Sequence, residues 1–305
     1  MFELWFLLTL LVPFLWALAN FYDKLIIEKI TGGGYALVFY SSLSIPFLLA
    51  IMYFMLEFSL TINFYHLLLL IISGVCFINA FMFYGKSLEI EESSRVVPLF
   101  SLTTIFLLFI DIFYFEVLSN SIQISGVLII ILGSLILSSN SFHILELFKP
   151  RKVLLYMGAL SLILAFHFSI ISYFSSMYSI ITITFYIFTG SFIGSFGILL
   201  LRKAREDVIK VYKKNTIFIL LIPIITNIID YGNFFLHNFT ISIAPSVTFV
   251  SAIANMQFVY VFILGIILSS LLPKYFTEDI SKNSLINKAV SIILIIGGVL
   301  LIQLF

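Results

Sequence analysis

The chain has little charge and a single cysteine. Of its 305 residues, 10% are charged and 62% are hydrophobic, whereas soluble domains average about 25% charged and about 45–50% apolar residues. A fold in water could not hide this much apolar surface, so we expect lipid to surround most of the chain. Cys76 stands alone, which excludes an intrachain disulfide. The net charge of +1 argues against a nucleic-acid partner.

Motifs for several kinds of chemistry are also missing from the sequence. There is no GxxxxGK[ST] loop, which argues against a built-in ATP drive. There is no HExxH motif and no cysteine cluster to hold a metal ion. The spacing of Ser, His and Asp residues suggests no catalytic triad. We therefore expect no metal, no cofactor and no enzyme activity.

The chain consists instead of about ten apolar stretches, each long enough to cross a bilayer as a helix. No basic residue precedes the first stretch, so we expect a retained span and not a cleaved signal. The longest polar connection, 202–214, is predicted to determine topology, with binding of anionic lipid headgroups as an alternative. The predicted spans are 4–23, 35–56, 64–86, 94–115, 121–139, 153–173, 178–201, 215–237, 244–271 and 286–304.

All 16 Lys and Arg residues fall in alternate connections between these spans or at the span ends beside them. The other connections and both termini contain none. Basic residues in short loops favour the cytoplasm, so this pattern predicts that both termini lie outside. The basic positions are Lys24, Lys29, Lys86, Arg95, Lys149, Arg151, Lys152, Arg202, Lys203, Arg205, Lys210, Lys213, Lys214, Lys274, Lys282 and Lys288.

The sequence repeats itself weakly. A shift of 151 lays the third and fourth spans over the eighth and ninth, and a shift near 147 lays Leu15–Phe21 over Leu162–Phe168. We infer two halves of five spans, 1–145 and 150–305. Because five is odd, the second half crosses the membrane in the opposite sense, which is a common plan of secondary transporters. The predicted fold is an all-α membrane protein of about ten transmembrane helices in two inverted five-helix repeats.

Four polar residues are expected deep in the spans, and the repeat relates them in two pairs. Asn79 corresponds to Asp230, and Asn20 corresponds to His167. Polar groups inside a membrane are costly and are functional candidates, so we expect these four to meet at one central substrate site. The alternative is structural, since membrane Asn and His residues often bond across helix interfaces. Four further candidates for the substrate site are Asn227, Gln257, Tyr84 and Tyr231.

Small residues recur at helical spacing in the seventh span. Gly190 and Gly194 form one such pair, and Ser191 and Ser195 form another. Pairs of this kind let two helix backbones approach closely. We expect them to pack within the chain, with a dimer contact as the alternative, so the chain is expected to be a monomer or a homodimer.

Several segments resemble the EamA family of the drug/metabolite transporter superfamily. They are the run Phe14–Phe21 with Asp23 and Lys24 after it, the run Phe83–Leu88 followed by Ser93–Leu99, and Gln123–Gly126 a few residues after Glu116. The resemblance implies ten helices in two inverted halves, alternating access, and export or exchange of small metabolites.

The chain also departs from the family it resembles. Family members often carry a proline midway in the fourth and ninth spans, where this chain has Thr103-Thr104 and Asn255–Gln257, so a gating kink there is not assured. The resemblance further implies that both termini lie in the cytoplasm, which opposes the orientation that the basic residues favour.

These features predict a secondary transporter in the cell membrane that moves a small amino-acid-like or drug-like metabolite, with coupling to protons or by exchange. Asp230 would carry the proton or contact a cationic group of the substrate. The expected partners are this substrate, membrane lipid and protons. One alternative is an intramembrane enzyme acting on a lipid-linked substrate, with Glu89, Glu91 and Glu92 as its acids. Another is a membrane scaffold that transports nothing.

Overall fold

The computed structural model describes residues 3–31, 34–56, 61–91, 96–116, 120–139, 152–214, 217–271 and 282–304. The regular structure in these ranges is helical throughout, without a strand, as the apolar stretches predict. Eight helices are long and apolar enough to cross a membrane, and Ser121–Leu137 is a shorter apolar helix. The count of ten crossings stays a prediction. The predicted boundary between the halves, 145–150, lies outside the described residues.

The helices follow the predicted spans closely along the chain. The first half contains α1 (Leu4–Ile26), α2 (Gly34–Ser42), α3 (Ile45–Met55), α4 (Phe64–Leu88), α6 (Ser101–Ile110) and α7 (Ser121–Ser139), with a 3₁₀ turn before α6 and the π-helical turn Asp111–Phe115 after it. The second half contains α9 (Lys152–Ser175), α10 (Ile180–Gly197), α11 (Arg202–Lys214), α12 (Ile217–Ile243), α13 (Val247–Ala254), α14 (Met256–Leu271) and α15 (Lys282–Leu304).

Several predicted spans differ from the helices found, among them the second, which divides into α2 and α3. The eighth was expected to end at 237, but α12 continues to Ile243 because the apolar and uncharged residues after His237 remain helical. The ninth was expected to be continuous, but it breaks at Asn255 between α13 and α14. The break forms without a proline: Asn255 N donates to Ala252 O over 3.1 Å, and Phe258 N donates to Asn255 O over 3.1 Å.

The polar connection 202–214 forms the amphipathic helix α11. Its buried side consists of Ala204, Val208 and Val211. Val208 and Val211 pack with Tyr40 of α2, and Ala204 packs with other residues of α2. The Tyr40 hydroxyl donates a hydrogen bond to Val208 O at 3.0 Å. The basic side chains lie on the other faces, as expected for a helix that lies at a membrane surface. This segment is thus an ordered helix packed on α2, where the sequence predicted a connection.

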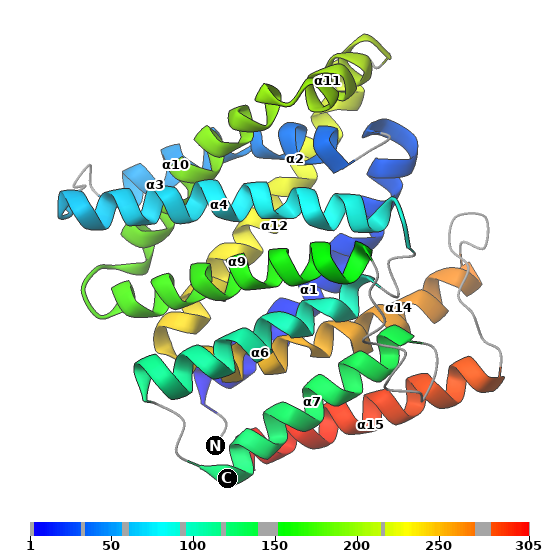
Figure 1. The fold of residues 1–305 in the computed structure, drawn as a ribbon. Helices are drawn as coiled ribbons and strands as arrows, with labels where there is room; N and C mark the ends of the chain where they lie inside the picture. Colours follow the sequence, from blue (N-terminus) through cyan, green and yellow to red (C-terminus); the bar gives the residue numbers. More distant parts are fainter. Residues whose placement is uncertain are drawn as a thin grey trace.

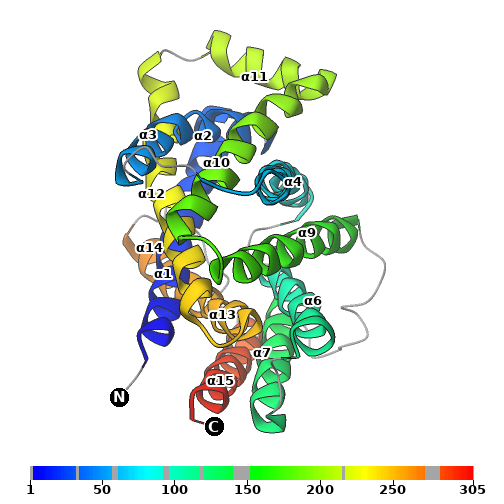
Figure 2. The ribbon, with the colours of Figure 1, turned by 90° about the vertical axis from the view of Figure 1, so that its left-hand side faces the viewer.

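The two ends of the chain lie close together on one side of the molecule (Figure 1 and Figure 2). We call this the terminal side. Consecutive long helices run in alternating directions from it (Figure 1), so the opposite side carries Lys29, Lys86, Lys152 and the helix α11. We call it the basic side. The grouping of basic residues in alternate connections predicted this segregation.

Small residues bring α4 and α10 into close contact. A Cβ atom built on Gly190 would overlap the backbone of Ile71, and one built on Gly74 would overlap the backbone of Ile187. Ser191 Oγ donates a hydrogen bond to Gly74 O at 3.1 Å. The small-residue pairs of the seventh span therefore pack within the chain, because only residues without a large side chain allow this approach.

This contact predicts a strong effect of one added methyl group. We expect Gly190→Ala to lower the melting temperature in detergent, because the new Cβ meets backbone that cannot move aside. The cost is about 1–3 kcal/mol for an overpacked site. Gly158→Ala is the matched control, since a Cβ there meets nothing within 4 Å. Equal melting temperatures for the two variants would contradict the packing described.

Candidate functional site

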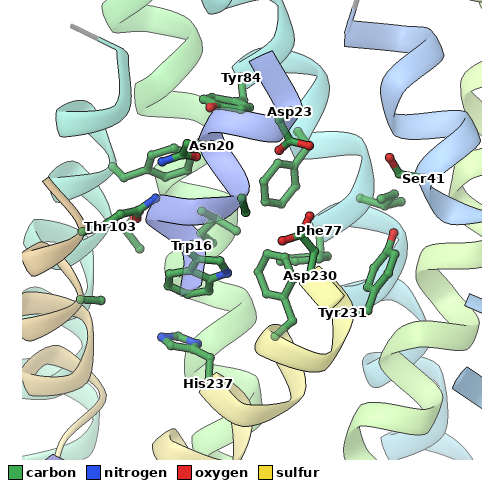
Figure 3. Close-up of a pocket in the computed structure, with 18 of the residues that line it drawn as sticks. Trp16, Asn20, Asp23, Ser41, Phe77, Tyr84, Thr103, Asp230, Tyr231 and His237 are labelled. Atoms are coloured by element: carbon green, nitrogen blue, oxygen red, sulfur yellow. The ribbon is translucent and has the colours of Figure 1, made fainter. Parts of the chain in front are cut away.

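One cavity of about 180 Å³ lies between helices of both halves. Helices α1, α2, α4 and α6 contribute to its walls from the first half, and α9, α12, α13 and α14 from the second. Figure 3 shows its polar and aromatic side chains. The lining residues are Trp16, Ala19, Asn20, Asp23, Gly34, Leu37, Val38, Ser41, Phe77, Ile78, Phe81, Tyr84, Gly85, Phe100, Thr103, Leu164, Phe168, Asn227, Asp230, Tyr231, Phe234, His237, Ser251, Ala254, Asn255, Gln257 and Phe258.

Two carboxylates face this cavity. Asp230 lies midway along α12 and is buried, and Asp23 lies in the last turn of α1. The two acids are close enough to interact electrostatically, and Tyr22 interacts with Asp230. Figure 3 shows both carboxyl groups among the aromatic rings. Among the described residues that line the cavity, none is Lys or Arg, so the lining is acidic.

Aromatic rings form much of the wall around the acids. Phe234 of α12 packs edge-on against Phe77 of α4, with ring centres 5.0 Å apart, and lies 5.4 Å from Trp16 of α1. Toward the terminal side, the ring centre of His237 lies 4.8 Å from those of both Trp16 and Phe168, with the ring planes tilted. The rings therefore link α1, α4, α9 and α12 around the acidic pair and keep the surroundings of the carboxylates largely apolar.

Several polar atoms in the cavity wall have no hydrogen-bond partner within the described part of the chain. They are Trp16 Nε1, Asn20 Nδ2, Thr103 Oγ1 and His237 Nδ1, and all four are buried. Buried polar groups in proteins are usually bonded to protein or to ordered water. These groups are thus available to bind a polar ligand, and the indole and amide nitrogens can act only as donors.

Six of the predicted substrate residues line the cavity together. They are Asp230, Asn20, Asn227, Gln257, Tyr84 and Tyr231. The spacing of three between Asn227 and Asp230 puts both on one face of α12. The side-chain amide of Asn227 also donates to Pro223 O at 2.9 Å, one turn back on the same helix.

Two predicted residues do not line the cavity, so the expected meeting of all four buried polar groups is wrong. Asn79 Nδ2 donates to Val75 O at 2.7 Å and to Gly194 O at 3.3 Å, which turns the side chain into the interface of α4 with α10. His167 Nδ1 is 2.8 Å from Ser73 Oγ, and its ring stacks on Phe77 at 4.4 Å. Both residues bond across helix contacts, which is the structural alternative that the sequence left open.

The sequence analysis missed several polar lining residues, among them Asp23, His237 and Asn255. Asp23 was treated as part of a family motif, although it follows Asn20 by three and so shares its helix face. His237 was assigned to a span end, although it follows Asp230 by seven on the same helix. Asn255 was considered as a departure from the family pattern and not as a substrate residue, but it lines the cavity together with Gln257 at the break between α13 and α14. Helical spacing could have found the first two.

The cavity lies in the half of the molecule nearer the basic side. Its outer residues, Asp23, Gly34 and Gly85, are at the helix ends on that side, while its deepest residues are near the middle of the spans. Gly34 and Gly85 touch, since a Cβ built on Gly34 would lie 2.7 Å from Gly85 Cα. The outer end of the cavity is therefore narrowed by the backbone of these two glycines and not by a side chain.

Hydrogen bonds join the two halves on the terminal side of the cavity. Asp111 follows α6 and is buried, and its Oδ2 accepts from Ser246 Oγ at 2.7 Å and from Thr248 N at 3.0 Å. Closer to the cavity, Thr104 Oγ1 lies 2.9 Å from Ser251 Oγ. We call the contacts of Asp111 with Ser246 and Thr248 the terminal latch. It joins α6 to the start of α13 and separates the cavity from the terminal side.

A protein-family model matches the first half of the chain. Residues 3–139 match the model of the EamA-like transporter family. The first half of the chain is similar to this family. The match covers the helices that contribute Asp23, Tyr84 and Thr103 to the cavity. Members of the family are membrane transporters.

A solved structure is similar in fold to the whole chain. A crystal structure described only as that of a protein covers 100% of this chain and 97% of its own, with a TM-score of 0.64 and 14% identity. At this identity the likeness shows the fold alone. No curated protein matches the chain by sequence. A multi-pass helical membrane protein follows from the family and the eight apolar helices.

Other chemistry has little support at this site. Among the described residues, no group of three or more His, Cys, Asp and Glu side chains is placed to hold a metal ion. Glu89 and Glu91, which the enzyme alternative would use, follow α4 and are not part of the cavity lining. Glu92 lies outside the described residues.

The position of the cavity predicts from which side water reaches it. In a Cys76→Ser background, we expect Ser41→Cys to react with a small membrane-impermeant thiosulfonate in the same membrane preparation as Lys213→Cys, which is exposed on the basic side. Ser121→Cys marks the terminal side, and Ser134→Cys is a buried control. The geometry would be contradicted if Ser41→Cys reacted only in the preparation that labels Ser121→Cys and not in the one that labels Lys213→Cys.

Proposed function

We propose that this chain is a secondary transporter that moves a small metabolite through the central cavity by alternating access. The observation that carries this proposal is the pair Asp23 and Asp230, held in a cavity between the two halves and deep in apolar helices. A buried charge in a membrane is costly. A transporter offers a reason to keep such groups, since substrate and protons can neutralise them in turn.

The inverted repeat supports this mechanism. Helix α4 packs on α9, and its proposed equivalent α12 packs on α1. Helix α6 packs on α9, and its proposed equivalent α14 packs on α1. Helices α7 and α15, which the repeat relates to each other, form a pair. Two halves with the same set of contacts can exchange their local arrangements, and such rocking around a fixed site is how inverted repeats give alternating access.

The cavity described above represents one state of that cycle. It reaches toward the basic side, while the terminal latch separates it from the other. The positive-inside rule favours a cytoplasmic basic side, so we propose that this state faces the cytoplasm with both termini outside. Labelling in intact cells tests this orientation: Ser121→Cys should react from outside and Lys213→Cys should not. Reaction of Lys213→Cys from outside would instead place both termini in the cytoplasm, as the family resemblance implies.

Asp230 is proposed to carry the coupling proton or to contact the substrate. Amino acids, amines and sugars would first be screened for thermal stabilisation of the purified protein, since a ligand stabilises the state it binds. Uptake of the best stabiliser into proteoliposomes would then be measured with and without a pH gradient. We expect Asp230→Asn to reduce uptake about tenfold or more and to abolish its response to the gradient, because the variant cannot release a proton.

Glu206→Gln is the matched control for this experiment, because Glu206 lies on the exposed surface of α11. It should transport like the natural protein. Undiminished and equally pH-dependent uptake by Asp230→Asn would exclude the proposed role of Asp230. A natural protein that moves none of the screened compounds would favour a scaffold.

The terminal latch is proposed to stabilise the state that faces the basic side. Hydrogen bonds to charged groups contribute about 1.5–3 kcal/mol each, so Asp111→Asn should shift the population about tenfold or more toward the state open to the terminal side. The thiosulfonate reaction of Ser41→Cys from the basic side should slow accordingly. Glu206→Gln again serves as control, and an unchanged reaction rate would show that the latch does not set the equilibrium.

A further inference from the structure

The acidic pair lies in a cavity that is lined by aromatic rings and uncharged polar groups over the described part of the chain. Among the described lining residues there is no Lys or Arg. Lys86 follows a lining residue, but its Nζ lies 5.8 Å from the ring centre of Tyr35 and 5.7 Å from that of Tyr156, outside the lining. His237 stands at the far end of the cavity from Asp23 (Figure 3). Two carboxylates close together repel each other when both are ionised, and a bound cation relieves this repulsion.

The walls beside the acids favour the same kind of ligand. Tyr231 and Phe234 lie on α12 next to Asp230, with ring centres 6.5 Å apart, and Phe81 lies 6.0 Å from Phe234. Tyr84 continues this wall 6.3 Å beyond Phe81. The faces of aromatic rings attract ammonium groups, and more strongly where water is excluded. The rings also accept an apolar body, which a small inorganic cation lacks.

The same lining disfavours a ligand with a carboxylate of its own. Such a group would face Asp23 and Asp230 without a Lys or Arg among the described lining residues to bind it. The unpartnered donors Trp16 Nε1 and Asn20 Nδ2 suit a neutral acceptor such as a hydroxyl or carbonyl oxygen. An amine without a carboxylate therefore fits better than a zwitterionic amino acid.

The volume of the cavity limits the size of this ligand. An apolar protein cavity of about 150 Å³ binds benzene, and the cavity here is about 180 Å³. A single ring with a short amine arm thus suits the space, whereas a drug with several fused rings requires the helices to move apart.

From these observations we infer that the cavity selects small organic cations, namely amines or quaternary ammonium ions with one aromatic or apolar group. The cation would lie between Asp23 and Asp230 against the rings of α12 and α4. This inference rests on the proposed function. It narrows the substrate from amino-acid-like or drug-like metabolites to organic cations.

Four one-ring compounds test the charge preference. They are phenethylamine (a cation), benzyltrimethylammonium (a permanent cation), L-phenylalanine (a zwitterion) and 3-phenylpropanoate (an anion). Dissociation constants would be measured by calorimetry on the purified full-length protein at neutral pH. We expect both cations to bind about 30-fold or more tightly than the zwitterion and the anion, the ratio typical of leaving a buried charge without its partner.

Trp16 provides a local reporter for the place of binding. The chain has 2 tryptophans, so Trp5→Phe leaves Trp16 in the cavity as the single source of indole emission. Benzyltrimethylammonium should change this emission with the same dissociation constant as in calorimetry. Emission that does not respond while calorimetry records binding would place the cation elsewhere and overturn the assignment.

Variants of the acids complete the test. Asp230→Asn and Asp23→Asn should each weaken benzyltrimethylammonium about 30-fold, and Glu206→Gln should not. Should either variant fail to fold, the ligand series on the natural protein still decides. Equal affinity for phenethylamine and L-phenylalanine, or affinity unaffected by both acid variants, overturns the inference.

The results also separate this inference from the proposed function. Cations that bind in the cavity but are not taken up by proteoliposomes would support the site and contradict transport. Uptake of a zwitterion or sugar without any binding of the two cations would support transport and contradict the cation site.

Discussion

The electrostatic relation of Asp23 and Asp230 is the constraint on which the site depends. Two acids share a cavity whose walls, in the part of the chain that the structure describes, offer rings and uncharged polar groups in place of bases. Charges in low-dielectric surroundings interact far more strongly than in water. Helices α1 and α12, which carry the acids, must therefore be held firmly, and Asn233 Nδ2 of α12 binds Val12 O of α1 at 3.1 Å. Aromatic contacts add α4 and α9 to the same unit.

The ninth span shows how the fold provides polar groups at the middle of a membrane. At Asn255 the helix stops and restarts, so that residues on both sides of the break face inward. The freed backbone groups are satisfied by tight turns, and the side chain reaches Thr104 Oγ1 at 3.4 Å on the other half. Irregular backbone at membrane depth is tolerated where it is buried in protein or lines a cavity. Here Asn255 takes the place where relatives often carry a proline.

The sequence carried the fold further than the site. Apolar length and the grouping of basic residues located the helices, because both follow from the thickness and polarity of the bilayer. Positions along one helix, such as Asn227 with Asp230, were also predictable from spacing. The directions of Asn79 and His167 were not, because each depends on a partner far away in sequence, Gly194 and Ser73. The extent of α12 hid His237, since its polar end reads like a connection.

The packing of α11 on α2 has a mechanical consequence. One face of α2 supplies Leu37, Val38 and Ser41 to the cavity, and Tyr40 on another face is bonded to the backbone of α11. Helix α11 carries six of the basic residues of the chain, at a depth where headgroup charge and lateral pressure act. A displacement of α11 would pull on Tyr40 and so move the neighbouring turn of α2, which forms part of the cavity wall. Helix α2 thus couples the position of the surface helix α11 to the shape of the cavity wall.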